Sequence, residues 1–301
     1  MKTYIGIDIA KLKFDVSTPQ GHFTFENEKT GFQRFLKHIE TFENPHCVCE
    51  STGGYELPLI LFLSKNKIAV SLENPTKVKH FLRSMGNLAK TDKADAEGLM
   101  SYGQRMNPRE WIAPSKVMLK MHSLMRRREG LIKMLKLEKI FFKMEKDRCI
   151  LKDIESHIKV LEKKIEKFEA EVEKLIEGDE KLKQRQDKII GINGFGRISA
   201  MSLICYLPEL GSLSREKVVA LAGLAPYNRD SGQKSGKRYI QGGRALLREK
   251  LYMPTSNAMR TNKIIREFAQ RLRSRGKAYK VIVIACMRKM LIHLNAQLKY
   301  L

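Results

Sequence analysis

TYIGIDIAK, residues 3–11, predicts a short buried strand that ends at an acid. Tyr4, Ile5 and Ile7 supply its apolar side chains, and Asp8 falls at or near its C-terminal edge. HCVCE, residues 46–50, repeats the pattern, because Glu50 closes an apolar run just before the turn residues 51–54. Two acids are therefore expected at the ends of two strands.

The segments around these two strands predict an α/β layer fold. IGIDI (5–9), KFDVST (13–18) and HFTFE (22–26) form a predicted meander, and IAVSLE (68–73) is a further strand. TGFQRFLKHIETF (30–42) and ELPLILFLSK (56–65) are predicted helices. Three consecutive strands followed by alternating helices and strands suit an RNase H-like fold, which would gather the strand-end acids at one end of the sheet.

Two more acids, Asp92 and Asp95, lie in the predicted helix KTDKADAEGLMSYG, residues 90–103. Helical positions three apart share a face, so both can point at one site. Four carboxylates suit two Mg²⁺ (or Mn²⁺) ions, which prefer oxygen ligands and assist phosphodiester chemistry. Each acid alone is explained as well by a strand end, a helix cap or a solvated face. As a set they favour a metal site.

The charge of the chain predicts a nucleic-acid partner. The 57 Lys+Arg against 33 Asp+Glu give a net charge of +24 and a pI near 9.8. Residues 190–301 carry 21 basic and 5 acidic residues, so this part holds most of the expected phosphate affinity. With no run of 18 apolar residues and no signal peptide, we expect a cytoplasmic, nucleoid-associated protein without a membrane partner.

Residues 111–188 are predicted to form a linker and a coiled coil, between a first domain at 1–110 and a third at 189–301. Apolar residues follow one another at spacings of three and four: Leu151, Ile154, Ile158, Leu161, Ile165, Phe168, Val172 and Leu175. An earlier helix carries Leu124, Leu131, Leu135 and Phe142. It can fold back on the later helix as an antiparallel hairpin, or both can pair with another chain.

Residues 189–301 predict a basic helical domain. GINGFG, residues 191–196, separates two apolar helical runs and looks like a helix-hairpin-helix turn, which either grips a phosphate or is a plain tight turn. Further on, a polar loop carries Ser231 and Ser235 among many cations. These surroundings would stabilise phosphoryl transfer to a serine hydroxyl, and composition does not choose between the two serines.

Together these motifs resemble the insertion-sequence-110 family of transposases, relatives of the Piv DNA invertase. The resemblance rests on GIDIAK, CESTGGYE, KTDKADAEGL, GINGFG, AGLAPYNRDSG and GGRALLR, and covers almost the whole chain. It implies a RuvC-like domain in which Asp8, Glu50, Asp92 and Asp95 bind Mg²⁺. It also implies a C-terminal transposase domain in which Ser231 forms a covalent 5′-phosphoserine link, with Ser235 as the runner-up.

The resemblance further implies a noncoding guide RNA that pairs with donor and target DNA, and a homo-oligomer, dimer or tetramer, held by the coiled coil and the C-terminal domain. The carboxylates of one subunit would meet the serine of another. Two alternatives are a RuvC-type nuclease with a water nucleophile and a non-catalytic dimeric DNA-binding regulator. The cations expected to contact nucleic acid are Lys11, Lys90, Lys93, Arg197, Arg229, Lys234, Lys237, Arg238, Arg244 and Arg248.

Overall fold

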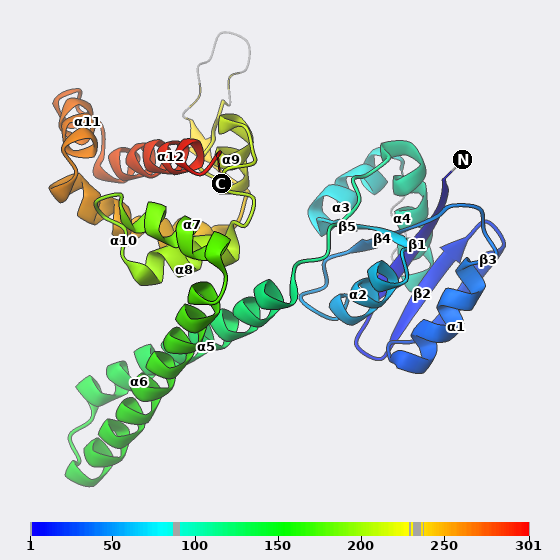
Figure 1. Cartoon of the computed structure of the whole chain (residues 1–301), viewed down its shortest axis with the longest axis horizontal. Coiled ribbons are helices and arrows are strands. Elements are labelled where there is room, and N and C mark those ends of the chain that lie inside the picture. Colours follow the sequence, from blue (N-terminus) through cyan, green and yellow to red (C-terminus); the bar gives the residue numbers. More distant parts are fainter. Residues whose placement is uncertain (1, 87–90, 229, 231–235, 237, 301) are drawn as a thin grey trace. The chain divides into compact units, whose positions relative to one another are not determined.

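The structure is a computed structural model that describes residues 2–86, 91–228, 230, 236 and 238–300. The chain divides into two compact units, Met1–Pro114 and Ser115–Leu301 (Figure 1). Across the described ranges, every helix is too short or too polar to cross a membrane.

The first unit is built on a five-stranded mixed sheet with the order β3-β2-β1-β4-β5. Its central strand β1 (Thr3–Ile9) pairs antiparallel with β2 (Lys13–Thr18), which pairs antiparallel with β3 (Gly21–Glu26). On its other edge β1 pairs parallel with β4 (Pro45–Glu50), and β4 pairs parallel with β5 (Ala69–Glu73). This mixed α/β arrangement is consistent with the predicted RNase H-like domain.

Helices cover both faces of the sheet. Side chains alternate between faces along a strand, so Ile5 and Ile7 of β1 point to one side and Tyr4 to the other. On the isoleucine side lie α1 (Lys29–Ile39) and α2 (Leu57–Lys65). On the Tyr4 side lie α3 (Pro75–Ser84) and α4 (Asp92–Met106). The sheet is thus the middle of three layers, and β1 is buried on both faces.

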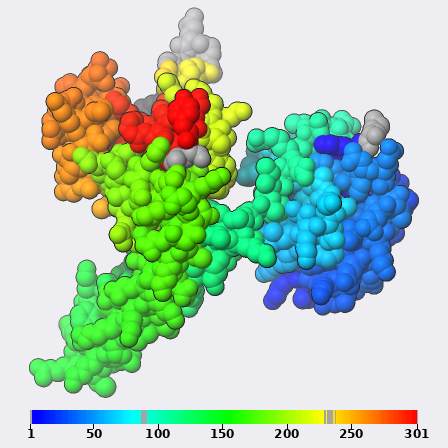
Figure 2. All heavy atoms as spheres, viewed as in Figure 1, coloured from blue at the N-terminus to red at the C-terminus, as the bar shows by residue number. Residues whose placement is uncertain are grey.

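The second unit begins with a long helical hairpin formed by α5 (Lys116–Met144) and α6 (Arg148–Glu177) (Figures 1 and 2). Along the apolar seam of α6, Leu161 and Ile165 pack against Leu131 of α5, and Val172 joins the larger core of the second unit. The buried seam residues are Ile154, Leu161, Ile165 and Val172, and the half-buried ones are Leu151, Ile158, Phe168 and Leu175. Of the two arrangements that the sequence left open, the structure has the antiparallel hairpin. Phe142, expected in the seam, is 41% exposed.

In the described part of the second unit, six further helices pack around one apolar core. They are α7 (Glu180–Ile190), α8 (Arg197–Tyr206), α9 (Arg215–Leu221), α10 (Ala245–Thr261), α11 (Lys263–Ser274) and α12 (Tyr279–Gln297). The glycine-rich turn 191–196 joins α7 to α8. Gly194 has a φ of +117°, and a Cβ there would collide with Ala258 and the Pro254 carbonyl of α10. Packing against α10 therefore requires glycine at this point of the turn.

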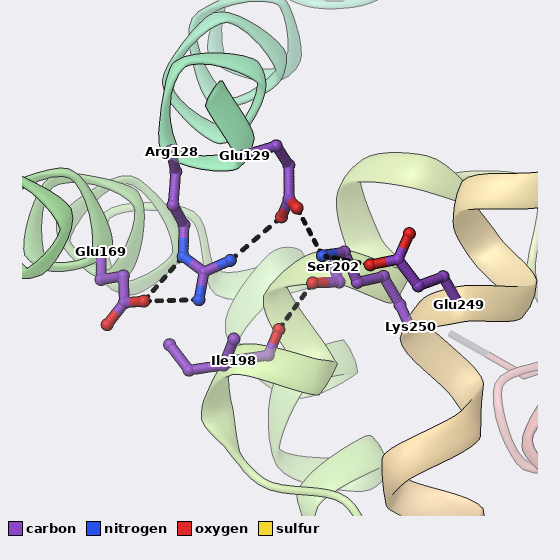
Figure 3. A network of polar contacts seen from close by, with 7 residues as sticks. All are labelled: Arg128, Glu129, Glu169, Ile198, Ser202, Glu249 and Lys250. Atoms are coloured by element: carbon purple, nitrogen blue, oxygen red, sulfur yellow. Dashed lines mark hydrogen bonds and ion pairs between the residues drawn. The ribbon is translucent and has the colours of Figure 1, made fainter. Parts of the chain in front are cut away.

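A buried ion network joins the hairpin to α10 (Figure 3). Arg128 of α5 is buried, and its guanidinium contacts Glu169 of α6 at 2.6 Å and Glu129 at 3.0 Å. Glu129 in turn lies 2.5 Å from Nζ of Lys250 on α10. A buried charge is stable only with a partner, so these pairs hold the base of the hairpin against the helices that follow.

Candidate active site

Two of the four predicted acids lie side by side at the carboxyl ends of β1 and β4. The parallel register pairs Ile7 with Cys49, which places Asp8 level with Glu50. Neighbouring strands lie about 4.8 Å apart. Alternation puts Asp8 on the same face as Tyr4, and Glu50 on the same face as Val48, which is the face covered by α4. Both carboxylates therefore point toward the helix that carries the other two.

The close approach of α4 to β1 depends on Gly6. A Cβ at this position would overlap the Ala96 carbonyl oxygen and the Met100 amide nitrogen of α4. At the start of the helix, Thr91 accepts a hydrogen bond from the Ala94 amide at 3.1 Å and caps the first turn. Asp92 and Asp95 occupy that turn, where the helix dipole favours negative charge.

The electrostatics of the four acids show that they share one region. The pKa of Asp8 is raised to about 6, first by burial and then by the neighbouring carboxylates of Asp95, Asp92 and Asp15. Burial also raises the pKa of Glu50, with Asp8 and Asp95 as the next contributors. Crowded carboxylates resist ionisation because each adds negative charge beside the others. A cation placed among them would relieve this repulsion.

Two residues that the sequence reasoning missed belong to the same region. Asp15 of β2 pairs directly with Asp8 in the antiparallel register. Lys13 bridges two acids, with Nζ 3.1 Å from Asp15 and 3.0 Å from Asp92. Sequence alternation alone gives no sign of this bridge, because it depends on the β1–β2 register and on where α4 begins.

The donor set fits a hard divalent cation, since it consists of carboxylates, two of which, Asp8 and Glu50, have pKa values raised first by burial and then by neighbouring acids. Asp8, Glu50, Asp92 and Asp95 are the residues that would hold it. Among the described residues, however, no three His, Cys, Asp or Glu side chains are grouped closely enough to hold a metal ion. Asp92, 62% exposed at its side chain, instead pairs with Lys13.

The raised pKa of Asp8 predicts how the stability of the first unit depends on pH. The unfolded chain releases this proton near pH 3.8 and the folded chain near 6, so the free energy of unfolding falls as pH rises through that window. After allowance for solvent screening, we expect Asp8 to contribute a loss of about 1–2 kcal/mol between pH 4 and 7 in EDTA, and this contribution to be absent in Asp8→Asn.

Trp111 provides a local reporter for this measurement. It is the one tryptophan of the chain and packs against the core of the first unit. Its fluorescence during urea unfolding therefore follows that unit. Glu97→Gln removes an exposed carboxylate from the same helix and serves as the control. An unchanged pH dependence in Asp8→Asn would contradict the assignment of the shift to Asp8.

The second unit supplies the loop of the predicted nucleophile. Ser231 and Ser235 lie outside the described residues, but the base of their loop is described. β6 (Pro226–Tyr227) pairs antiparallel with β7 (Tyr239–Ile240), which brings the two ends of the segment together. Within it, the Asp230 carboxylate accepts a hydrogen bond from the Gly236 amide at 2.9 Å.

Arg244 and Arg248, two of the residues predicted to contact nucleic acid, form hydrogen bonds with protein groups at the base of this loop. Arg244 donates to both carboxylate oxygens of Glu209, at 2.6 and 2.8 Å, and to the Tyr206 carbonyl at 2.8 Å. Arg248 donates to the carbonyls of Gly242 and Ala222. Their guanidinium groups thus already have protein acceptors on either side of the loop.

The other predicted contacts differ in their surroundings. Lys11, Lys93 and Arg238 are exposed. Arg197, the first residue of α8, lies 3.7 Å from Glu173. Lys90, Arg229, Lys234 and Lys237 lie outside the described residues. Their contacts with nucleic acid remain predictions.

Comparison with known proteins agrees with the motifs. Residues 5–141 match a family of DEDD transposases of the IS110 type, and residues 186–270 match the family described as Transposase IS116/IS110/IS902. The pilin gene-inverting protein of Moraxella bovis is 31% identical over 304 residues, which cover 96% of this chain and 94% of that protein. The pilin gene-inverting protein of Moraxella lacunata is similar to the same extent.

Proposed function

Because the chain belongs to the IS116/IS110/IS902 family of transposases, enzymes that act on DNA, we propose that it is a site-specific recombinase that cuts and rejoins DNA through a covalent phosphoserine intermediate. The observation that carries the proposal is the level placement of Asp8 and Glu50 on the face that meets α4. In this proposal Asp92 and Asp95 complete the metal-binding set, and Ser231 is the nucleophile.

The chain's own residues divide the reaction between the two units. Ser231 Oγ attacks phosphorus, the bond from phosphorus to the 3′ oxygen breaks, and that oxygen leaves as a 3′ hydroxyl. The 3′ hydroxyl of another strand then attacks the phosphoserine and releases the serine. Mg²⁺ held by the carboxylates would stabilise charge on the reacting oxygens. Since phosphodiester energy is kept in the serine link, ATP is not required.

Guidance by a noncoding RNA is part of the same proposal. It is supported by the family and by the +16 charge of residues 190–301, which suits the backbones of both RNA and DNA. The Moraxella relatives are named for inverting a pilin gene. Inversion requires two exchanges of strands at defined sites, which is the reaction class proposed for this chain.

We further propose that the working enzyme is a homo-oligomer that uses the distal end of the α5–α6 hairpin. On the last three turns of α5, apolar side chains are exposed: Met134, Leu137, Ile140, Phe141, Phe142 and Met144. Apolar groups grouped on an exposed helix end favour contact with a partner. A second copy of the chain suits a composite active site, in which the carboxylates and the serine come from different subunits.

The hairpin proposal predicts a change of oligomeric state in one variant. Phe141→Glu/Met144→Glu places two charges where the side chains are 54% and 74% exposed, so folding should not suffer while self-association weakens. Light scattering on a size-exclusion column should show a dimer or tetramer for the wild type and a smaller species for the variant. Lys143→Glu is the matched control, and a monomeric wild type at tens of micromolar would reject the proposal.

A denaturing gel tests the proposed chemistry. Purified protein would be incubated with Mg²⁺, the RNA transcribed beside its gene, and labelled DNA that spans the junction of the element. A labelled band that migrates with the protein and disappears after protease treatment indicates the covalent intermediate. Free cleaved ends without this band would indicate a nuclease with a water nucleophile. Binding with neither product would indicate a non-catalytic regulator.

A further inference from the structure

A polar cavity of about 650 Å³ lies between the end of α10, the face of α11 and the start of α12. Arg260, Arg266, Arg273, Gln270 and Tyr279 contribute to its wall. None of these residues was selected from the sequence. The residues that line the cavity include none of the four carboxylates and none of the residues at the base of the serine loop.

The charge around the cavity is positive and not neutralised. Within the described residues, none of its three arginines forms an ion pair with an acid. Residues 257–301 contain eleven Lys and Arg against one acid, Glu267. A guanidinium group binds phosphate through two parallel hydrogen bonds, and three of them around one cavity favour an anionic ligand.

The ligand groups are spaced along a helix rather than gathered at a point. Arg266, Gln270 and Arg273 occupy positions i, i+4 and i+7 of α11, which lie on one face of the helix. With a rise of about 1.5 Å per residue the row is roughly 10 Å long. Arg260 extends it from the last turn of α10. A row of cations suits consecutive phosphates better than a single small anion.

One further feature of the wall suits a nucleotide. Tyr279 is 53% exposed and is the first residue of α12, a helix whose N-terminus has no side-chain cap. An exposed aromatic ring next to phosphate-binding groups can stack on a base.

We propose that this cavity binds the sugar-phosphate backbone of a single-stranded nucleic-acid segment, with Arg260, Arg266 and Arg273 on phosphates and Tyr279 stacked on an unpaired base. The inference rests on the proposed function, which supplies both RNA and DNA as partners. The Tyr279 ring can stack only on a base that is not already stacked within a duplex, so we expect the cavity to prefer single strands over duplexes.

The test compares two variants with equal loss of charge. Arg260→Gln/Arg266→Gln/Arg273→Gln removes the cavity cations, and Lys263→Gln/Arg275→Gln/Lys277→Gln removes three exposed neighbours outside it. Fluorescence anisotropy would measure binding of a 20-nucleotide RNA, the same DNA sequence and its duplex at several salt concentrations. Losing three single-strand phosphate contacts is expected to flatten the plot of log K against log salt by about 2. The control should change this slope by less than half as much.

Substitutions of Tyr279 test the proposed base stacking separately from the phosphate contacts, because they do not change the charge of the cavity. Tyr279→Ala should weaken single-strand binding about tenfold, whereas Tyr279→Phe should bind like the wild type. A loss confined to RNA or to DNA supports the site and identifies its strand. Equal effects of the two triple variants, or an equal loss on duplex, would overturn the proposal. The anisotropy test measures binding and not cleavage. If the denaturing gel showed no covalent adduct for the wild type, the recombinase chemistry would be rejected, but the binding result for the cavity would still hold.

Discussion

Ser231→Ala is expected to abolish the covalent protein–DNA adduct and to lower strand exchange by about 10⁴-fold or more, since no other atom replaces the attacking oxygen. Affinity for DNA and RNA should change little, because the substitution removes one hydroxyl and no charge. The measurement is the denaturing gel described above, run beside an anisotropy titration with the same DNA.

Ser235→Ala is the matched control for this experiment. It lies four residues further along the same loop and carries the same hydroxyl, so the adduct should persist in it. If the adduct disappears only in Ser235→Ala, the nucleophile has been assigned to the wrong serine. Full recombination in both single variants would reject a serine mechanism.

Asp8→Asn is expected to reduce strand cleavage by at least about a thousandfold, while nucleic-acid binding is retained. Asp8 is the most central of the four acids, lying level with Glu50 and within electrostatic reach of Asp92 and Asp95. Replacing one charged ligand weakens metal binding, so the metal stabilises the charge on the reacting oxygens less in the transition state. The expected loss of transition-state stabilisation is on the order of 4 kcal/mol. A gel-based cleavage assay across a Mg²⁺ titration measures the loss.

Glu97→Gln is the control for charge, since it removes an exposed carboxylate from α4. It should cleave at nearly the wild-type rate at every Mg²⁺ concentration. Wild-type cleavage that continues unchanged in EDTA would show that the carboxylates do not act through a metal. Cleavage by Asp8→Asn at the wild-type rate would remove Asp8 from the site.

The placement of the strand-end acids followed from the sequence because strands have a fixed period of two. In β1 and β4 the apolar residues at alternate positions mark the core face, which leaves Asp8 and Glu50 on the opposite face. The family inferred from the motifs is also confirmed by the comparisons. Helix α3 was not predicted, although Asn74 and Pro75 are a recognisable helix start and the Asn74 side chain accepts a hydrogen bond from the Thr76 amide.

Features that depend on contacts between distant segments could not be predicted. The bridge from Lys13 to Asp92 joins residues 79 positions apart. The bidentate pair of Arg244 with Glu209 joins residues 35 positions apart. Because the sequence does not reveal this partner, Arg244 was expected to contact nucleic acid. The choice between a hairpin and a partner chain for α6 likewise depended on whether α5 offers a matching surface, which the structure shows.

The close contact at Gly6 has a consequence for how such an enzyme can evolve. Any replacement adds at least a methyl group where the α4 backbone lies against β1, so every mutation of this codon that changes the amino acid disturbs the strand and the helix together. Asp8 belongs to the strand in this contact, and Asp92 and Asp95 belong to the helix. Selection for a stable domain and selection for a working site therefore act on the same position. A substitution at Gly6 that affects one of these properties also affects the other.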